Sequence, residues 1–202
     1  MSFLDLPRVF GVVGALVAGV CFCGAMLISL WSSGPFIVVL LVIGYVGMLE
    51  GLLGLHTAQA SQYGRLGIIG FWLAIIGTVL SLAAGLITVV AALLRLEDVT
   101  ADASLALVGY FLLIIGFLLL GIATLRARVL PAWAGLLLII GSIVMLLLPP
   151  FAASLMLLLP PFVASSFQRL LWVVPGVVWL ALSYALWTRR GETGEMGRGI
   201  DT

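Results

Sequence analysis

The chain has 202 residues, of which 64% are hydrophobic and only 8% are charged, and its formal net charge is +1. Its mean hydropathy of +1.35 lies far above the range of soluble globular domains and excludes that class. The composition therefore predicts an integral membrane protein.

Charged and turn-forming residues divide the chain into six apolar segments. Most of them are long enough to cross about 30 Å of hydrocarbon as a helix. They cover residues 9–31, 35–55, 67–94, 104–125, 132–148 and 170–188. The sequence therefore predicts an all-α integral membrane bundle of six transmembrane helices. This single domain would cover residues 1–188, and a disordered cytoplasmic tail would follow over residues 189–202.

The first apolar segment follows Arg8, as the hydrophobic part of a secretory signal peptide would. From Val9 to Trp31 it is longer than such a part, and it lacks a small-x-small cleavage site before a polar stretch. We therefore interpret it as the first transmembrane helix.

Small residues recur at spacings of three and four along the first three segments. In lipid, close approach of helix backbones through small side chains is the main route to tight packing. The stripes consist of Gly11, Gly14, Ala18, Cys21 and Ala25; of Gly44, Gly47, Gly51 and Gly54; and of Gly67, Gly70, Ala74, Gly77, Ser81, Ala84, Thr88 and Ala91. We expect these three helices to form a compact unit in which the second and third lie closest.

Residues 52–78 and 119–142 share the anchors LLG and IIG, followed by Thr or Ser. This match indicates that the hairpin of helices two and three is related to that of helices four and five by a parallel repeat. The alternative is a chance match, which apolar sequence of low complexity produces readily.

The stretch MLLLPPFAASLMLLLPPFVASS, residues 145–166, carries two Pro-Pro steps. Proline disrupts a helix interior and is favoured in a first turn. We expect Pro149 and Pro150 to end the fifth helix. A short extra helix, separated from the fifth by these prolines, should then begin at the outer face between helices five and six. A dry docking surface is favoured over a re-entrant loop, because the stretch has few polar side chains.

Arginine sets the expected orientation, because the chain has no lysine. With six spans, one side collects Arg8, Arg65, Arg126, Arg128, Arg189, Arg190 and Arg198, and the other side has Arg95 and Arg169. The rule that basic residues stay inside predicts that both termini are cytoplasmic.

Two residues are candidates for chemistry within the spans. Glu50 is the only acidic residue well inside a predicted span, and such carboxylates often mark a proton or cation pathway. The alternative is a neutral, hydrogen-bonded Glu50 that supports packing. His56, the sole histidine, is a candidate axial ligand for a haem or pigment, or simply a solvated helix end.

Arg65, Arg126 and Arg128 form a predicted basic collar that could hold anionic lipid headgroups. Their topological role alone also explains them.

The sequence also predicts that the chain is not an enzyme. It has no lysine for a Schiff base, no zinc-binding cluster or HExxH motif, no Walker A motif and no GxSxG elbow. We expect no metal and no resident cofactor.

The segment LLLGIATLRARVLPAWAGLLLIIG, residues 118–141, resembles small, uncharacterised bacterial multi-span proteins, in which a helix ends in an Arg-rich turn and a Pro-Trp step opens the next. This resemblance implies residence in the bacterial cell (inner) membrane.

Three functions stay open. The first is a non-catalytic accessory or assembly subunit of a larger membrane complex, motivated by small-residue stripes and short loops. The second is a small ion- or proton-coupled transporter or channel using Glu50. The third is a pigment or haem carrier through His56. The expected partners are membrane lipid and other membrane chains or further copies of this one, and no nucleic acid.

Overall fold

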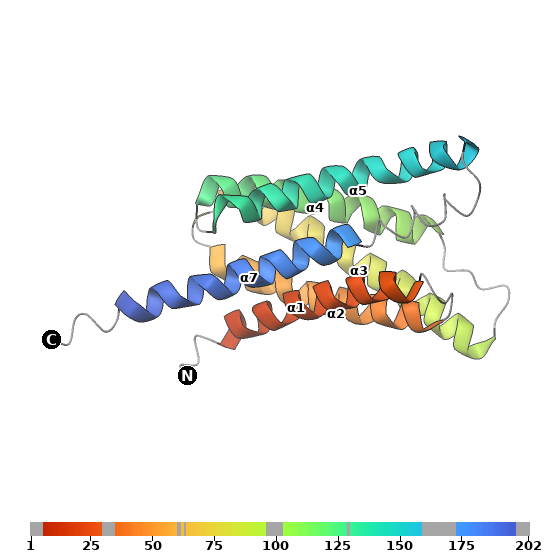
Figure 1. The fold of residues 1–202 in the computed structure, drawn as a ribbon, viewed down its shortest axis with the longest axis horizontal. Coiled ribbons are helices and arrows are strands. Elements are labelled where there is room, and N and C mark those ends of the chain that lie inside the picture. The colour runs from red at the N-terminus through yellow and green to blue at the C-terminus, as the bar shows by residue number, and fades with distance from the viewer. Residues whose placement is uncertain are drawn as a thin grey trace.

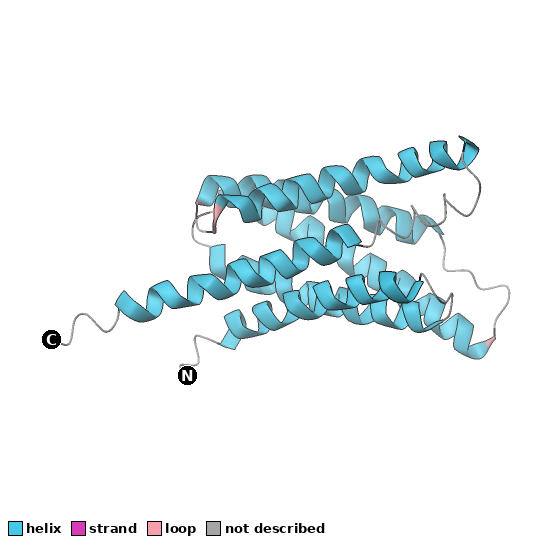
Figure 2. Cartoon of the chain, viewed as in Figure 1, coloured by secondary structure: helices cyan, strands magenta, loops and turns pink. Residues whose placement is uncertain are grey.

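The computed structural model describes residues 6–29, 35–59, 62, 64–95, 103–128, 130–158 and 173–196. These residues form six α-helices and contain no strand (Figure 2). The helices are α1 (Leu6–Ser29), α2 (Pro35–Gln59), α3 (Gly64–Leu94), α4 (Ala103–Ala127), α5 (Ala132–Leu158) and α7 (Val173–Met196). The predicted all-α class and the number of helices are thus confirmed for the described part of the chain.

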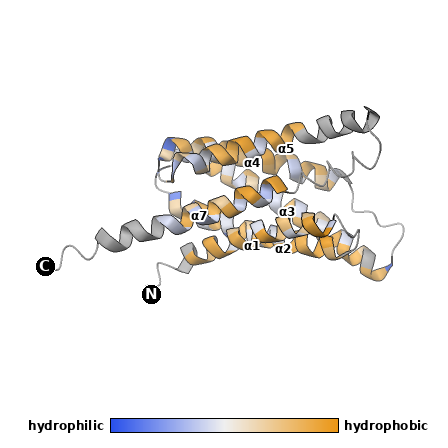
Figure 3. Cartoon of the chain, in the orientation of Figure 1, coloured by the Kyte–Doolittle hydropathy of each residue, from blue (hydrophilic) through white to orange (hydrophobic). Residues whose placement is uncertain are grey.

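The helices run alternately up and down one elongated bundle (Figure 1). Consequently α1 begins and α7 ends at the same end of the molecule. Apolar residues cover the length of the helices, and hydrophilic residues lie near the ends (Figure 3). Large exposed hydrophobic side chains occur on every described helix. A surface so apolar is unusual for a protein in water.

Four of the described helices are long and apolar enough to cross a membrane: Val9–Ser29, Phe36–Gln59, Gly64–Ala91 and Ser104–Ala127. Shorter apolar stretches, Ala132–Leu147 and Val173–Thr188, lie within α5 and α7. The prediction of helices that are long and apolar enough to cross a membrane is therefore confirmed for the first four segments.

Glycines bring two pairs of helices into backbone contact. A Cβ atom added at Gly54 of α2 would overlap the Cα of Gly11 of α1. Between α3 and α4, a Cβ at Gly77 would lie 2.5 Å from the backbone nitrogen of Leu113. Neither position has room for a larger residue without a shift of the backbone.

Our expectation that the second and third helices lie closest is wrong. The most extensive packing joins α1 to α2 and α3 to α4, and α2 meets α3 over a smaller area. The reason is that the stripe on α3 faces Gly109 and Gly116 of α4, where a Cβ at Gly116 would lie 2.7 Å from the Cα of Ala74.

Helix α7 closes the bundle by packing along α1 and reaching α5 and α2. Ser183 on α7 donates a hydrogen bond from its hydroxyl to the carbonyl oxygen of Val12, at 3.0 Å. The indole ring of Trp179 lies over Gly51, where a Cβ would come within 2.5 Å of the ring. Trp179 is only 1% exposed and thus belongs to the core.

The predicted break at Pro149 and Pro150 is also wrong, because α5 continues through both prolines to Leu158. In a helix the N–H of residue 149 would pair with the carbonyl of Met145, and proline has no N–H. The hydroxyl of Tyr110 on α4 donates to this carbonyl at 2.5 Å. A neighbouring helix thus replaces the missing donor, as it commonly does in apolar surroundings.

The residues expected to form a short extra helix, 151–158, are therefore the last part of α5. The second Pro-Pro step, and with it the rest of the expected docking feature, lies outside the described residues. Helix α7 extends to Met196, so the first part of the expected tail, residues 189–196, is helical. Lengthening an existing helix costs little, since its nucleus is already formed. Residues 197–202 lie outside the described part.

Substitution at a tight glycine should distinguish packing from helix propensity. Gly54→Ala should lower the free energy of unfolding by about 1–3 kcal/mol, because the new methyl group overpacks the contact with Gly11. The measurement is denaturant unfolding of the purified chain in detergent micelles.

Gly24→Ala is the matched control, because nothing lies within 4 Å of a Cβ at Gly24. It should leave stability unchanged or raise it by up to about 1 kcal/mol. Equal losses in both variants would contradict this account of the packing.

Candidate functional site

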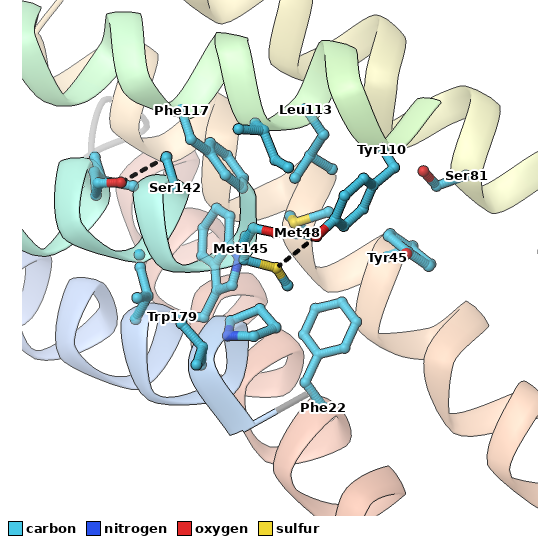
Figure 4. A pocket seen from close by; sticks show the side chains of 16 residues that line it. Phe22, Tyr45, Met48, Ser81, Tyr110, Leu113, Phe117, Ser142, Met145 and Trp179 are labelled. Atoms are coloured by element: carbon cyan, nitrogen blue, oxygen red, sulfur yellow. Dashed lines mark hydrogen bonds between the residues drawn. The ribbon is translucent and has the colours of Figure 1, made fainter. Parts of the chain in front are cut away.

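An inner cavity of about 50 Å³ lies inside the bundle, and all six described helices contribute to its wall (Figure 4). Its lining is mostly apolar and aromatic. Phe117 and Trp179 meet there edge to face, with ring centroids 5.8 Å apart. The lining residues are Phe22, Tyr45, Met48, Ser81, Tyr110, Leu113, Ile114, Phe117, Leu138, Gly141, Ser142, Met145, Val174, Pro175, Val178 and Trp179.

An outer crevice of about 560 Å³ adjoins the inner cavity between α2, α3 and α4. It exists because α2 and α4 both pack against α3, whose surface here carries the small residues Ala84 and Gly85. The crevice opens to the outside of the bundle, since Ala106 is exposed and Leu107 is 56% exposed. Its lining residues are Val38, Leu41, Val42, Tyr45, Ser81, Ala84, Gly85, Thr88, Ala106, Leu107 and Tyr110.

Tyr45, Ser81 and Tyr110 line both spaces and therefore form the wall between them. Figure 4 shows Tyr45 and Ser81 on one side of Tyr110, and Phe117 and Trp179 on the other. At about 1.5 Å per residue, Tyr45 lies about 15 Å along α2 and Tyr110 about 10 Å along α4 from the first residue of each helix.

Most buried polar side chains are satisfied locally. Thr78 donates to the carbonyl of Ala74 at 2.6 Å, and Ser142 donates to the carbonyl of Leu138 at 2.7 Å. Among the buried side-chain nitrogens and oxygens of the described residues, two have no hydrogen-bond partner, and one of these is the indole nitrogen of Trp179. A buried unpaired donor of this kind is costly, and Trp179 is also one of the residues that line the inner cavity.

The other buried nitrogen without a partner is the side-chain amide of Gln59. Its amide oxygen accepts a hydrogen bond from the hydroxyl of Thr124 at 3.1 Å, and both side chains are buried. This bond joins the last residue of α2 to the last turn of α4. The two helices are thus linked at one end of the bundle, whereas the crevice separates them toward the other.

Glu50 is half-buried at the contact between α1 and α2. A Cβ added at Gly14 would lie 3.0 Å from its carboxylate oxygen Oε2, so its side chain lies against α1. Glu50 lines neither the inner cavity nor the outer crevice. Its proposed role as an ion or proton relay stays a prediction.

His56 is half-buried and stacks on Phe71 of α3, with ring centroids 4.2 Å apart and an interplanar angle of 20°. It lines neither space. The structure thus gives its ring a packing contact between α2 and α3. Axial ligation by His56 stays a prediction.

The three arginines of the predicted collar lie at one end of the bundle. Arg65 is in the first turn of α3, Arg126 is in the last turn of α4, and Arg128 follows directly. All three are exposed. Their binding to lipid headgroups stays a prediction.

No group of three or more His, Cys, Asp or Glu residues able to hold a metal ion occurs within the described residues. Nor does either space have a charged residue among its described lining. The residues that line the two spaces offer apolar surface, five hydroxyl groups, four of them around the inner cavity, and the unpaired indole N–H of Trp179.

Sequence reasoning did not single out Tyr45, Tyr110 or Trp179. A usable signal was present, because each of these residues lies well inside an apolar segment, whereas Tyr and Trp usually gather at membrane interfaces. Amphipathic side chains far from an interface need a polar partner, which is a reason to look for a cavity there.

No protein-family model, curated protein or solved structure matches this chain. The resemblance of residues 118–141 to small bacterial membrane proteins therefore stays a prediction.

The bond between Tyr110 and Met145 can be tested by a double-mutant cycle. Tyr110→Phe should lower the free energy of unfolding by about 1–3 kcal/mol, because it leaves the Met145 carbonyl without a donor. In the Pro149→Ala background an N–H becomes available to that carbonyl, and the same substitution should cost clearly less. The measurement is denaturant unfolding in detergent of all four chains. An equal cost in both backgrounds would refute the compensation.

Proposed function

We propose that this chain is a non-catalytic, multi-span protein of a cell membrane that holds an apolar chain in the crevice between α2, α3 and α4. One observation carries the proposal: an apolar crevice of about 560 Å³ that opens on the side of the bundle. This volume falls within the usual range of ligand pockets, about 300–1,000 Å³.

The position of the crevice supports hydrocarbon as its occupant. Its residues lie within Phe36–Gln59, Gly64–Ala91 and Ser104–Ala127, the stretches apolar enough to cross a membrane. At that depth the opening would face lipid rather than water. A hydrocarbon chain therefore fills it at little cost, whereas leaving the space empty forfeits dispersion contacts.

Binding is favoured over chemical conversion by the groups available. The described residues around both spaces offer hydroxyls and an indole but no carboxylate, imidazole, thiol or amine. Serine and tyrosine hydroxyls act as nucleophiles or as general acids and bases when a neighbouring base activates them, and the described lining of the two spaces offers no such base. Transport through Glu50 ranks below binding because Glu50 lines neither space.

An accessory or assembly role in a larger membrane complex is the second candidate. It is favoured by the outward face of α3, a helix that packs mainly on α2 and α4. This face carries a row of exposed large side chains: Ile68, Ile69, Trp72, Ile76 and Val79. A tryptophan among aliphatic residues is typical of the energetic centre of a protein interface.

The proposed setting is the bacterial cell membrane with six spans and both termini cytoplasmic. The support for the orientation is the unequal distribution of arginine between the two sides of the six-span topology. Arg65, Arg126 and Arg128 at one end would then face anionic lipid on the cytoplasmic side.

Blocking the crevice should abolish binding of a hydrocarbon probe. The full chain is reconstituted in lipid nanodiscs with hexadecane that carries a photoreactive diazirine, and the labelled peptides are mapped by mass spectrometry. Labelling should concentrate on the crevice residues of α2, α3 and α4. Ala106→Phe should lower it at least about fivefold, because the new ring occupies the opening.

Val108→Phe is the matched control, because Val108 is 51% exposed, lies two residues away on α4 and lines neither space. It should leave the labelling pattern unchanged. Labelling spread evenly over the outer surface of the unmodified chain, with no change in the Ala106→Phe variant, would contradict the proposal.

Cysteine accessibility tests the orientation. In a chain with Cys21 and Cys23 replaced by alanine, Gln62→Cys should react with a membrane-impermeant maleimide in inside-out vesicles and not in intact cells. Gln62 is exposed in the turn between α2 and α3. Leu94→Cys, at an exposed position near the other end of α3, should show the opposite pattern. The reverse result would overturn the orientation.

A further inference from the structure

We infer that the ligand is a neutral long-chain alcohol, whose hydroxyl head enters the inner cavity while its hydrocarbon chain lies in the outer crevice. This inference rests on the proposed function, because it presupposes that the crevice holds a chain. It adds the chemical class of the ligand and the residues that recognise its head.

The size of the inner cavity limits the head. Its volume is about 50 Å³. A cavity that accommodates benzene has about 150 Å³, and a single water needs roughly 10–15 Å³. The inner space therefore accepts a group of one to a few atoms, such as a hydroxyl, and excludes an aromatic or quinone ring.

The hydrogen-bonding groups of the inner cavity select among small heads. Trp179 lines this cavity and its indole N–H has no partner, so a head that reaches this N–H must supply an acceptor. Tyr110 and Ser142 donate their own protons to the carbonyls of Met145 and Leu138. Their oxygens can then only accept, so the head should also supply a donor. A hydroxyl group does both, whereas an ester can only accept.

Charge excludes the other common lipid heads. The described lining of the two spaces contains no arginine, lysine or histidine that could pair with a carboxylate or phosphate. Burying such an anion without a partner costs several kcal/mol or more. A neutral head is therefore required.

The lateral opening fits an amphiphile that arrives from the membrane. Tyr45, Ser81 and Tyr110 line both spaces, so a molecule that occupied both would contact these three hydroxyl-bearing side chains. Its chain would then extend past Ala84, Gly85 and Ala106 to the outside of the bundle.

Competition against the photoreactive hexadecane tests the inference in the full chain in nanodiscs. The competitors are hexadecan-1-ol, methyl hexadecanoate, hexadecanoate and hexadecane. Hexadecan-1-ol should compete about five- to tenfold better than hexadecane, the effect of one or two net hydrogen bonds. The methyl ester should fall between them, and the carboxylate should be the weakest competitor.

Two variants attribute the preference to the inner cavity. Trp179→Phe removes the free N–H, and Ser142→Ala removes an acceptor whose own donated bond stays within α5. Each should reduce the advantage of the alcohol over hexadecane to about twofold or less, with competition by hexadecane itself unchanged. If loss of the Trp179 indole prevents folding, Ser142→Ala alone tests whether the inner cavity causes the preference for the alcohol.

The matched controls are Trp133→Phe and Ser183→Ala, at an exposed tryptophan and a buried serine that line neither space. Both should keep the full preference for the alcohol. Equal competition by all four compounds, or a preference that survives both Trp179→Phe and Ser142→Ala, would overturn the inference while leaving hydrocarbon binding intact. Failure of the crevice to be labelled at all would instead overturn the proposed function.

Discussion

Backbone contact at glycine positions is the constraint on which the rest of this bundle depends. Gly11 meets Gly54 between α1 and α2, and Gly77 meets Gly109 between α3 and α4, so close that a methyl group would not fit. Helices in apolar surroundings gain little from burial of side chains against one another, and dispersion contact between closely packed surfaces has to hold them together. These contacts tie four of the six described helices into two tight pairs.

The spaces inside the molecule follow from how the two pairs meet. The contact between α2 and α3 is less extensive than the contacts within either pair, and α7 fills only part of the gap. Trp179 of α7 reaches Gly51 on one side and Phe117 on the other, so the core is closed beside it. Toward the opposite face, Ala84 and Gly85 are too small to bridge from α3 to α2 and α4, and the crevice remains.

The sequence allowed the helices to be predicted far better than their partners. Apolar length locates the first four helices that could cross a membrane, and the stripe that begins at Gly67 correctly marks a packing face of α3. A stripe of small residues carries no information about which helix it meets, however, and the glycines of α4 were not recognised as its counterpart. The tyrosines and the tryptophan inside apolar segments indicate that a cavity exists, but its position could not be predicted, because it depends on where small residues such as Ala84 and Gly85 leave space between helices. The carbonyl that Pro149 leaves without a donor is bonded by Tyr110, which lies 35 residues earlier in the chain, and this pairing could not be predicted from the sequence.

That bond also connects the backbone of α5 to the chemistry of the inner cavity. Because Pro149 has no N–H, the carbonyl of Met145 needs a donor from elsewhere, and Tyr110 commits its only hydroxyl proton to it. A tyrosine whose proton is used in this way presents lone pairs, and no donor, to the cavity that it lines. The preference for a ligand with its own proton is thus a consequence of a proline in a neighbouring helix. An amide N–H at position 149 would free the Tyr110 hydroxyl to donate, and the cavity would then suit a head that only accepts.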